Sequence, residues 1–357
     1  MRAVIAVLAG DGIGPEVTAE AVRALLAVGA QYGHSFEVRE AALGGIAIDR
    51  TGLPLPPETV RICRASDAVL LGAVGGPRWG PSSPVRPEQG LLALRHALGV
   101  FANLRPASIH PRIVDASPLK PAVLRGVDVM IVRELTGGIY FGEKRREPDW
   151  AEDLCTYGAE EIARVVRVAA RLAKARSGRL TSVDKANVLE TSRLWREVAT
   201  RVVRDEFPGV QLDHQYVDSC ALRLIQKPSE FDVVVTENLF GDILTDLTAV
   251  LGGSIGMLPS ASLGESGPGI YEPVHGSAPD IAGKGLANPY GAIRSAALLL
   301  RHSLRLDSEA RALEAAVSAA LESGALTADV ASGDRACSTA EAGEAVLRAL
   351  SLHKETR

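Results

Sequence analysis

Near the N-terminus, an apolar run, Ala3-Val4-Ile5-Ala6-Val7-Leu8-Ala9, leads directly into a glycine-rich turn, Gly10-Asp11-Gly12-Ile13-Gly14-Pro15. A short, almost uninterrupted aliphatic run is typical of a strand buried on both faces of a parallel sheet. The residues that follow, 15–31, are predicted to form a helix, because Pro15 stands at a first-turn position that proline favours. The segment therefore predicts a strand, a tight turn and a helix.

The same alternation of short β-rich runs and longer helical runs continues along the chain. Strands are predicted at 2–9, 36–43, 68–74, 128–134, 179–184, 211–217 and 231–236. Helices are predicted at 15–31, 159–176, 190–206, 240–251, 290–305, 308–321 and 339–350. This βαβ rhythm predicts a doubly wound α/β fold, and the Val, Ile and Leu runs favour parallel strand pairing.

The size and composition of the chain exclude several classes of protein. With 357 residues, the chain is longer than one compact core usually holds, so two domains are expected. Hydrophobic residues make up 46% of the chain and charged residues 23%, which excludes wholesale disorder. The formal charge of −4, from 39 basic and 43 acidic side chains, argues against a nucleic-acid coat or a polybasic membrane binder.

The cysteines and the apolar runs point to the cytoplasm. Cys63, Cys155, Cys220 and Cys337 are far apart, which fits neither a zinc site nor a disulfide scaffold. No apolar stretch approaches the roughly 20 residues that a membrane span needs, and the N-terminal run is too short for a signal peptide. We therefore expect a soluble cytoplasmic protein.

The segment 137–157 departs from this rhythm. It contains a Gly137-Gly138 pair, then Ile139-Tyr140-Phe141, and then a charged stretch over 143–149. We expect this segment to be an extended excursion or hairpin arm that reaches a partner subunit.

Acidic residues follow two of the predicted strands, at the sheet edge where ligands of open α/β folds bind. Asp242 and Asp246 are four residues apart, so on a helix both carboxylates leave the same face and repel each other unless a cation lies between them. Asp218 follows another strand. Three such oxygen ligands suit Mg²⁺ or Mn²⁺ better than zinc. The alternative is that Asp242 caps the helix and Asp246 is merely solvated.

Three arginines lie in or beside apolar stretches rather than in charge runs: Arg95, Arg105 and Arg133. An arginine beside buried strand residues needs an anion, and its planar guanidinium suits a carboxylate, although a surface position is the default. Lys185 and Tyr140 stand at the ends of apolar strands. Either could carry a proton in a suitable environment, and each could equally be an ordinary polar residue.

Two glycine-rich segments could contact a cofactor. The turn at 10–15 places Pro15 where a dinucleotide fingerprint needs its third glycine, so a tight turn near an active site is the better interpretation. The loop over 272–285, which is followed by Asn288, is too rich in Gly, Pro and small residues for a core element. Its backbone can approach a flat ligand, and Asp280 could accept hydrogen bonds from a ribose diol. An ordinary surface loop would not explain its length well.

Together these motifs resemble the isocitrate/isopropylmalate dehydrogenase family of β-decarboxylating dehydrogenases. The resemblance rests on five long motifs: the Arg95/Arg105 stretch and the segments 133–142, 182–189, 238–246 and 272–285. It implies the fold of that family, with two doubly wound α/β domains and an active-site cleft between them. The first, cofactor-binding domain would comprise 1–100 and 253–357. The second would comprise 101–252, with a dimerisation arm at about 137–157.

The resemblance also implies roles for individual residues. The carboxylates of the substrate would be held by three arginines: Arg95, Arg105 and Arg133. Mg²⁺ or Mn²⁺ would be bound by three aspartates, of which the first would also contact the substrate: Asp218, Asp242 and Asp246. The catalytic pair would be Lys185 and Tyr140. Lys185 and Asp218 would come from the second subunit, so the protein would be a homodimer with a composite active site.

The implied reaction is the NAD-dependent oxidation and decarboxylation of a 2-hydroxy acid. Lys185 would take the proton of the 2-hydroxyl as hydride passes to NAD, and Tyr140 would protonate the enol left when CO₂ departs. NAD is favoured over NADP because the carboxylate of Asp280 repels a 2′-phosphate. The residues that would contact NAD are Gly75, Gly76, Glu88, Glu272, His275, Gly276, Ser277, Ala278, Asp280, Ile281 and Asn288.

Substrate choice rests on positions that resemble the pocket for the third substituent: Glu88, Leu91, Leu92 and Val188. The leucine pair favours a branched alkyl group, worth roughly 1.5–3 kcal/mol if buried. The third carboxylate of isocitrate or homoisocitrate would meet no cation there, which disfavours both. We therefore expect 3-isopropylmalate as substrate, 4-methyl-2-oxopentanoate as product and a place in leucine biosynthesis.

Two segments depart from the family pattern. In 218–222 a run of small residues ending in methionine is expected, and 246–248 lacks an acidic residue after the last metal aspartate. These departures leave open a sister dehydrogenase that acts on tartrate, alkylmalates or isocitrate. A non-catalytic paralogue is a further alternative, but such a protein would be expected to lose Lys185, Tyr140 or a metal aspartate, and this chain retains them all.

Overall fold

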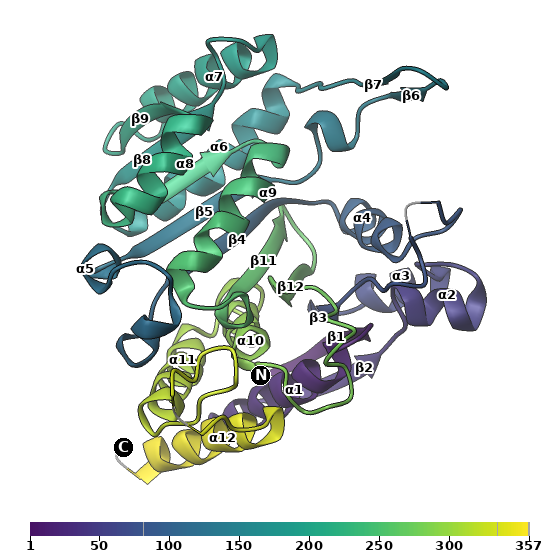
Figure 1. Ribbon diagram of the computed structural model, residues 1–357, viewed down its shortest axis with the longest axis vertical. Helices are drawn as coiled ribbons and strands as arrows, with labels where there is room; N and C mark the ends of the chain where they lie inside the picture. Colours follow the sequence, from purple (N-terminus) through teal and green to yellow (C-terminus); the bar gives the residue numbers. More distant parts are fainter. Residues whose placement is uncertain (81, 334, 356–357) are drawn as a thin grey trace. The chain divides into compact units, whose positions relative to one another are not determined.

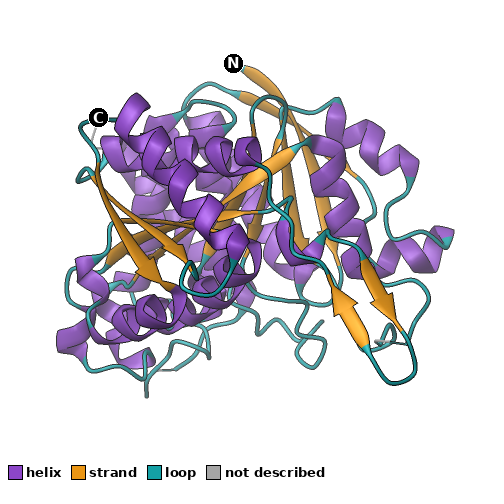
Figure 2. Ribbon diagram, turned by 90° about the horizontal axis from the view of Figure 1, so that it is seen from above, coloured by secondary structure: helices purple, strands orange, loops and turns teal. Residues whose placement is uncertain are grey.

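The structure, a computed structural model, describes residues 1–80, 82–333 and 335–355 (Figure 1). The chain divides into two compact units. Unit 1 comprises Met1–Val100, His110–Ala116 and Gly253–Arg357, and unit 2 comprises Phe101–Ile109 and Ser117–Gly252. The first of the expected domains runs to residues 356–357, which lie outside the described residues. Figure 2 shows the strands of each unit flanked by helices.

The strands of unit 1 have the order β2-β1-β3-β12-β11. Their bounds are β1 (Arg2–Gly10), β2 (Ser35–Glu40), β3 (Ala68–Ala73), β11 (Pro259–Gly264) and β12 (Gly269–Pro273). The β2–β1, β1–β3 and β3–β12 pairs are parallel, whereas β11 and β12 pair antiparallel. The helices are α1 (Gly14–Gln31), α2 (Gly45–Thr51), α3 (Pro57–Arg64), α4 (Pro87–Leu98), α10 (Tyr290–His302), α11 (Asp307–Glu322) and α12 (Thr339–Glu355), with short 3-10 turns at Pro111–Ala116 and Ile255–Met257.

Burial explains why the N-terminal segment folds as a strand and a covering helix. β3, beside β1, is buried along its whole length, as expected of an aliphatic strand covered on both faces. On α1, Val17, Ala21, Leu25 and Val28 recur at helical spacing and are all buried. Helix α1 contacts α10 and α12, so the core of unit 1 contains residues from both the N-terminal and the C-terminal parts of the chain.

The strands of unit 2 have the order β4-β5-β10-β8-β9. Their bounds are β4 (Val100–Ser108), β5 (Asp128–Glu134), β8 (Arg179–Asp184), β9 (Gln211–Tyr216) and β10 (Val233–Thr236). The β5–β10, β10–β8 and β8–β9 pairs are parallel, whereas β4 and β5 pair antiparallel. The helices are α5 (Pro121–Leu124), α6 (Ala159–Ala175), α7 (Glu190–Glu206), α8 (Val217–Gln226) and α9 (Asn238–Leu247), with short 3-10 turns at Gly138–Tyr140, Pro228–Glu230 and Thr248–Gly252.

The expected arm is a hairpin of unit 2. β6 (Lys144–Arg146) pairs antiparallel with β7 (Ala151–Asp153), and Figure 1 shows both strands projecting from the helices of the unit. Trp150 at the tip and Leu154 after it are about half exposed, at 49% and 54%. A hairpin over 144–153 thus lies within the segment 137–157, which was expected to be an extended excursion or hairpin arm, and its contact with a partner subunit stays a prediction.

Every predicted strand and helix is confirmed, with ends that differ by a few residues. The pairs between two predicted strands are all parallel, as expected, and the antiparallel pairs β4–β5 and β11–β12 involve strands that were not predicted. β4, β11 and β12 were not predicted, because they contain Pro, Gly or polar residues that obscure a strand pattern. Helices α2, α3, α4, α5 and α8 were missed as well, and Asp218 lies in the first turn of α8. None of the described helices has the length and apolar character needed to cross a membrane.

Candidate active site

α9 carries two of the predicted metal ligands, and its N-terminus is capped by the residue before it. The carboxylate of Glu237 accepts hydrogen bonds from the backbone N–H groups of Leu239 (3.1 Å) and Phe240 (2.6 Å). Asp242 is therefore not the cap, and that alternative is wrong. One turn later, Asp246 leaves the same face of the helix as Asp242.

Asp242 is bound by two of the predicted site residues. Its Oδ1 accepts a hydrogen bond from Nη1 of Arg133, and its Oδ2 accepts one of 2.6 Å from the Tyr140 hydroxyl. Burial alone would raise the pKa of Asp242, but the charge of Arg133 and the tyrosine hydrogen bond lower that pKa below its usual value. Asp242 is therefore ionised at neutral pH.

The same contact has the opposite effect on the tyrosine. Burial, followed by the hydrogen bond and charge of Asp242, raises the pKa of Tyr140 to about 12. The guanidinium carbon of Arg133 lies 5.6 Å from the centre of the tyrosine ring. Tyr140 therefore holds its phenolic proton over the physiological range, which is the state that a proton donor needs.

Arg105 forms a second group on the other end of α9. Its Nη1 donates to the hydroxyl of Thr245 (2.8 Å) and to Oδ1 of Asp246 (3.1 Å), and its Nε donates to Oδ1 of Asn103 (3.0 Å). The side chain of Asp246 is mostly exposed, yet it is paired rather than merely solvated. Arg105 and Arg133, the two predicted substrate ligands in unit 2, thus lie against the two acids of α9.

Lys185 and Asp218 lie together at the ends of two neighbouring strands. Lys185 follows β8 and Asp218 follows β9, and their side chains are joined by a 2.5 Å hydrogen bond from Nζ to Oδ1. This hydrogen bond and the positive charge of the lysine lower the pKa of Asp218. The parallel pairing of β8 with β9 brings the two residues to the same sheet edge.

The three predicted metal ligands fall into two groups in the chain. Asp242 and Asp246 are paired with arginines on α9, whereas Asp218 is paired with Lys185. Within the described residues, no three His, Cys, Asp or Glu side chains are placed to hold a metal ion. The donor chemistry of α9 nevertheless fits Mg²⁺ or Mn²⁺, because it offers two carboxylates on one helix face that are already balanced by positive charge.

In unit 1, four predicted residues share one face of α4: Glu88, Leu91, Leu92 and Arg95. Nη2 of Arg95 donates to Oε1 of Glu272 at 2.8 Å, and both side chains are mostly buried. The Nε of Arg95 is buried and has no hydrogen-bond partner within the part of the chain that the structure describes. Leu91 packs partly on the core of unit 1.

The glycine turn at 10–14 contacts the loop over 272–285. The backbone N–H of Ile13 donates to the carbonyl of Ser277 (2.8 Å), and a Cβ on Gly12 would lie 1.9 Å from that oxygen. Gly12 has a φ of +57°, so a side chain there would be excluded by both space and conformation. Glu16 accepts hydrogen bonds from the N–H groups of Gly283 and, at 2.9 Å, Gly285.

Asp11, in the same turn, fixes two further segments. Its carboxylate accepts hydrogen bonds from the backbone N–H groups of Gly45 (2.8 Å), Ile46 (2.8 Å) and Gly75 (2.9 Å). A Cβ on Gly75 would lie 3.0 Å from Oε1 of Glu88 and 3.7 Å from the hydroxyl of Ser277. Three of the predicted NAD contacts, Gly75, Glu88 and Ser277, therefore lie close together, and Gly76 follows directly.

The remaining predicted NAD contacts lie in or just after the loop. His275 is buried, its Nδ1 bonds to the carbonyl of Gly276 (2.9 Å), and its Nε2 has no hydrogen-bond partner among the described residues. Ala278 adopts a φ of +37°, a conformation that non-glycine residues rarely take. Asp280 is exposed and Ile281 partly so. Asn288 is engaged internally, with its Nδ2 bonded to Asp329 (2.9 Å) and its Oδ1 to the N–H of Tyr290 (2.9 Å).

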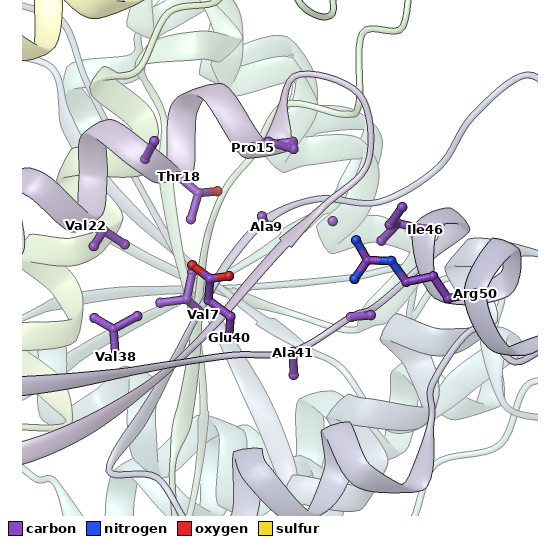
Figure 3. A pocket seen from close by; sticks show the side chains of 13 residues that line it. Val7, Ala9, Pro15, Thr18, Val22, Val38, Glu40, Ala41, Ile46 and Arg50 are labelled. Carbon is purple, nitrogen blue, oxygen red and sulfur yellow. The ribbon is translucent and has the colours of Figure 1, made fainter.

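A groove of about 820 Å³ lies elsewhere in unit 1, between α1 and α2 (Figure 3). Its wall is mostly small and aliphatic, with Glu40 and Arg50 as its charged members. It contains none of the predicted catalytic, metal, substrate or NAD residues.

Of the predicted substrate residues, Val188 is 62% exposed on unit 2, just before α7.

Sequence reasoning missed several residues that hold the site together. They are Asp11, Glu16, Asn103 and Asn238. Asn103 and Asn238 stand inside two of the motifs that carry the family resemblance, Asp11 stands in the glycine turn, and Glu16 directly follows that turn. What they contact could not be read from spacing.

A sequence model of the family described as Isocitrate/isopropylmalate dehydrogenase matches residues 4–346. The chain is similar to a 3-isopropylmalate dehydrogenase of Anaeromyxobacter dehalogenans, with 60% identity over 336 residues that cover 92% of this chain and 95% of the relative. It is also similar to a 3-isopropylmalate dehydrogenase of Rhodopirellula baltica, with 55% identity over 357 residues that cover 98% of this chain and 99% of the relative.

The chain is also similar to solved structures of dehydrogenases. An isocitrate dehydrogenase from Methylococcus capsulatus has a TM-score of 0.87 and 34% identity, with 98% of this chain and 99% of that chain covered. A β-decarboxylating dehydrogenase from Thermococcus kodakarensis has a TM-score of 0.81 and 38% identity, with 98% and 96% covered. The chain therefore belongs to the isocitrate/isopropylmalate dehydrogenase family.

Proposed function

We propose that the protein is an NAD- and metal-dependent dehydrogenase of the cytoplasm that converts 3-isopropylmalate to 4-methyl-2-oxopentanoate and CO₂ in leucine biosynthesis. The observation that carries the proposal is the arrangement on α9 of unit 2, where Tyr140 and two arginines meet the carboxylates of Asp242 and Asp246. The choice of substrate is supported by relatives at 53–60% identity that are named 3-isopropylmalate dehydrogenase.

Lys185 is the proposed base for oxidation. Its Nζ would take the proton of the substrate 2-hydroxyl as that carbon loses hydride. The side chain is partly exposed and is oriented by Asp218 at 2.5 Å, so a ligand can reach the amine without the lysine leaving its strand end. The bond to Asp218 also limits the number of positions that Nζ can adopt.

Tyr140 is the proposed acid for the second half of the reaction. Its hydroxyl would give a proton to the enol carbon left when CO₂ departs. A pKa of about 12 keeps that proton in place until a strongly basic carbon is present. Arg133 and Asp242 fix the ring and the hydroxyl, so the donor needs little reorganisation.

Arg95, Arg105 and Arg133 are the proposed ligands of the substrate carboxylates. A guanidinium offers five N–H donors, and a carboxylate takes two of them side by side. Arg95 keeps a buried Nε–H that no described residue satisfies, which supports a ligand at that residue.

Asp218, Asp242 and Asp246 would hold the divalent cation, and the loop over 272–285 would hold NAD together with Gly75, Gly76, Glu88 and Asn288. When bound, the cation stabilises negative charge on the substrate oxygen, and NAD accepts the hydride. The buried, unsatisfied Nε2 of His275 fits this assignment, since a bound nucleotide would supply its missing partner. Asp280 and Ile281, exposed on the same loop, would face the ribose.

The active form is proposed to be a homodimer in which Lys185 and Asp218 complete the partner's site. The proposal is supported by the separation of Asp218 from the acids of α9 into its own group. Apolar side chains exposed on unit 2 also support it, including Leu222 on α8 (57% exposed) and Ile243 on α9 (56%). Helices α8 and α9 contact each other, so these side chains offer a surface for a second copy.

The test is NADH formation from 3-isopropylmalate with Mn²⁺ by the purified protein, beside isocitrate, tartrate and malate, and with NADP in place of NAD. We expect turnover of 3-isopropylmalate with NAD and little with NADP. Faster turnover of another acid would keep the mechanism and overturn the assignment of Leu91, Leu92 and Val188 to the substrate pocket. A metal-loaded dimer that turns over none of these acids would contradict the proposal.

A further inference from the structure

Arg133 and Arg105, the proposed substrate ligands in unit 2, are each bound by a neutral amide as well as by an acid. Nε and Nη2 of Arg133 donate to Oδ1 of Asn238 at 3.0 and 2.8 Å. Nε of Arg105 donates to Oδ1 of Asn103 at 3.0 Å. The two asparagines are buried, with exposed fractions of 1% and 0%. In each arginine the acid of α9 binds a different nitrogen, Nη1.

Asn238 also connects Arg133 to the segment that carries the tyrosine. Its Nδ2 donates to the carbonyl of Gly137 at 3.2 Å, and Gly137 begins the 3-10 turn Gly138–Tyr140. Its backbone N–H donates to the hydroxyl of Tyr157 at 3.0 Å. One amide side chain therefore fixes both a proposed substrate ligand and the start of the turn that presents the proposed proton donor.

The aliphatic stem of Arg133 is packed too closely to shift if the hydrogen bonds of its guanidinium are changed. A Cβ added to Gly241 on α9 would lie 2.5 Å from Cγ, 2.8 Å from Cβ and 3.0 Å from Cδ of Arg133. The aliphatic part of the arginine thus lies directly on the helix backbone. With the stem held on α9, the hydrogen bonds of Nε and Nη2 to Asn238 fix one edge of the guanidinium, and the hydrogen bond of Nη1 to Asp242 holds its other end.

We propose that Asn238 and Asn103 are positioning residues that set the guanidinium planes of Arg133 and Arg105 for the carboxylates of the substrate. The inference rests on the proposed function, which makes these arginines substrate ligands. A neutral carbonyl oxygen accepts an N–H without cancelling the positive charge that attracts a carboxylate. A carboxylate in its place would add a second negative charge beside the arginine, and at position 238 it could not donate to Gly137.

The test uses the variants Asn238→Ala and Asn103→Ala, which remove the amide oxygen that accepts from the arginine, with Asn238→Ser as a second variant in case the first is poorly folded. We expect KM for 3-isopropylmalate to rise about ten-fold or more in each, the size expected for losing a well-placed charged hydrogen bond. KM for NAD is expected to change less than about two-fold, because neither asparagine is in unit 1. Gln211→Ala, which removes an exposed amide side chain of β9, is the matched control.

Crystal structures of the variants are the second measurement. They are expected to show the guanidinium of Arg133 or Arg105 rotated from its present plane, and this result does not depend on the substrate being 3-isopropylmalate. A wild-type protein without turnover would count against the proposed function alone. Unchanged guanidinium planes, or variants whose stability falls while KM for the substrate stays at the wild-type value, would overturn the positioning role.

Discussion

Lys185 and Tyr140 each have an aspartate as hydrogen-bond partner, and the two pairs differ in their surroundings. Lys185 and Asp218 are partly open to solvent at the ends of two strands. Tyr140 and Asp242 lie deeper, beside Arg133, and burial raises the pKa of the tyrosine. This difference is consistent with the proposed roles, in which Lys185 accepts a proton during oxidation and Tyr140 stays protonated until it donates to the enol.

Replacing Lys185 with Ala tests the role of the base. We expect kcat to fall by about 10²-fold or more, the usual contribution of a positioned general base, while 3-isopropylmalate still binds. Initial rates and calorimetric titration of the substrate measure the two quantities. Lys174→Ala, which removes an exposed lysine of α6, is the control. Wild-type turnover by the Lys185→Ala variant would contradict the role given to this residue.

At the scale of elements, the loop over 272–285, which is proposed to bind NAD, is hydrogen-bonded to the start of α1. The two carboxylate oxygens of Glu16 accept hydrogen bonds from the backbone N–H groups of Gly283 and Gly285. A glutamine in its place has one oxygen and one NH₂ group, so in the same geometry it could accept only one of the two hydrogen bonds. Glu16→Gln is therefore expected to raise KM for NAD several-fold, since a charge-assisted hydrogen bond contributes about 1.5–3 kcal/mol, while kcat stays close to wild type.

Steady-state kinetics with NAD as the varied substrate provide the check. Glu37→Gln, at an exposed position of β2, serves as the matched control. If Glu16→Gln lowered kcat and left KM for NAD unchanged, the loop would not depend on this anchor.

The C-terminal end of α10 contains a histidine that folding keeps neutral. Burial, and then the charges of Arg301 and Arg305, lower the pKa of His302 from 6.5 to about 4. The unfolded chain therefore takes up a proton more readily, so stability falls as pH decreases from about 6.5 towards 4. The loss between pH 7 and pH 5 is expected to be about 1–2 kcal/mol from this residue.

Urea unfolding of the wild type and of His302→Gln at pH 7 and pH 5 measures this effect. The variant is expected to lose less unfolding free energy over this interval than the wild type. His96→Gln, which removes an exposed histidine of α4, should follow the wild type. Equal pH dependence of His302→Gln and wild type would show that His302 does not titrate on unfolding.

At the scale of the whole molecule, the proposed homodimer with a composite site predicts complementation between two inactive variants. Lys185→Ala and Tyr140→Phe would each inactivate both sites of a homodimer. In a mixed dimer, one site would receive the intact tyrosine of the first subunit and the intact lysine of the second. With random exchange of equal amounts, about a quarter of all sites would be active, since half of the dimers are mixed and each has one intact site.

The measurement is the activity of the two variants before and after they are unfolded together and refolded. Each variant refolded alone is the control. Refolded mixtures with no more activity than the separate variants would place both residues of a site in the same chain, and a monomer in sedimentation would contradict the dimer itself.

The sequence by itself predicted seven of the strands, seven of the helices, the hairpin and the family, and it indicated the arginines, the acids, the lysine and the tyrosine by type. Aliphatic runs and helical spacing are local properties, so they can be read along the chain. The comparisons confirm the family. The antiparallel pairs and the roles of Asp11, Glu16, Asn103 and Asn238 were not predictable in this way.

Those features depend on contacts between residues that are far apart in the chain. Asn238 and Arg133 are separated by 105 positions, and Glu16 and Gly285 by 269. Such pairs meet only because strand order and register bring them to one sheet edge or one turn. The residue types that the chemistry needs are thus present in the sequence, whereas tertiary structure decides the orientation of each side chain.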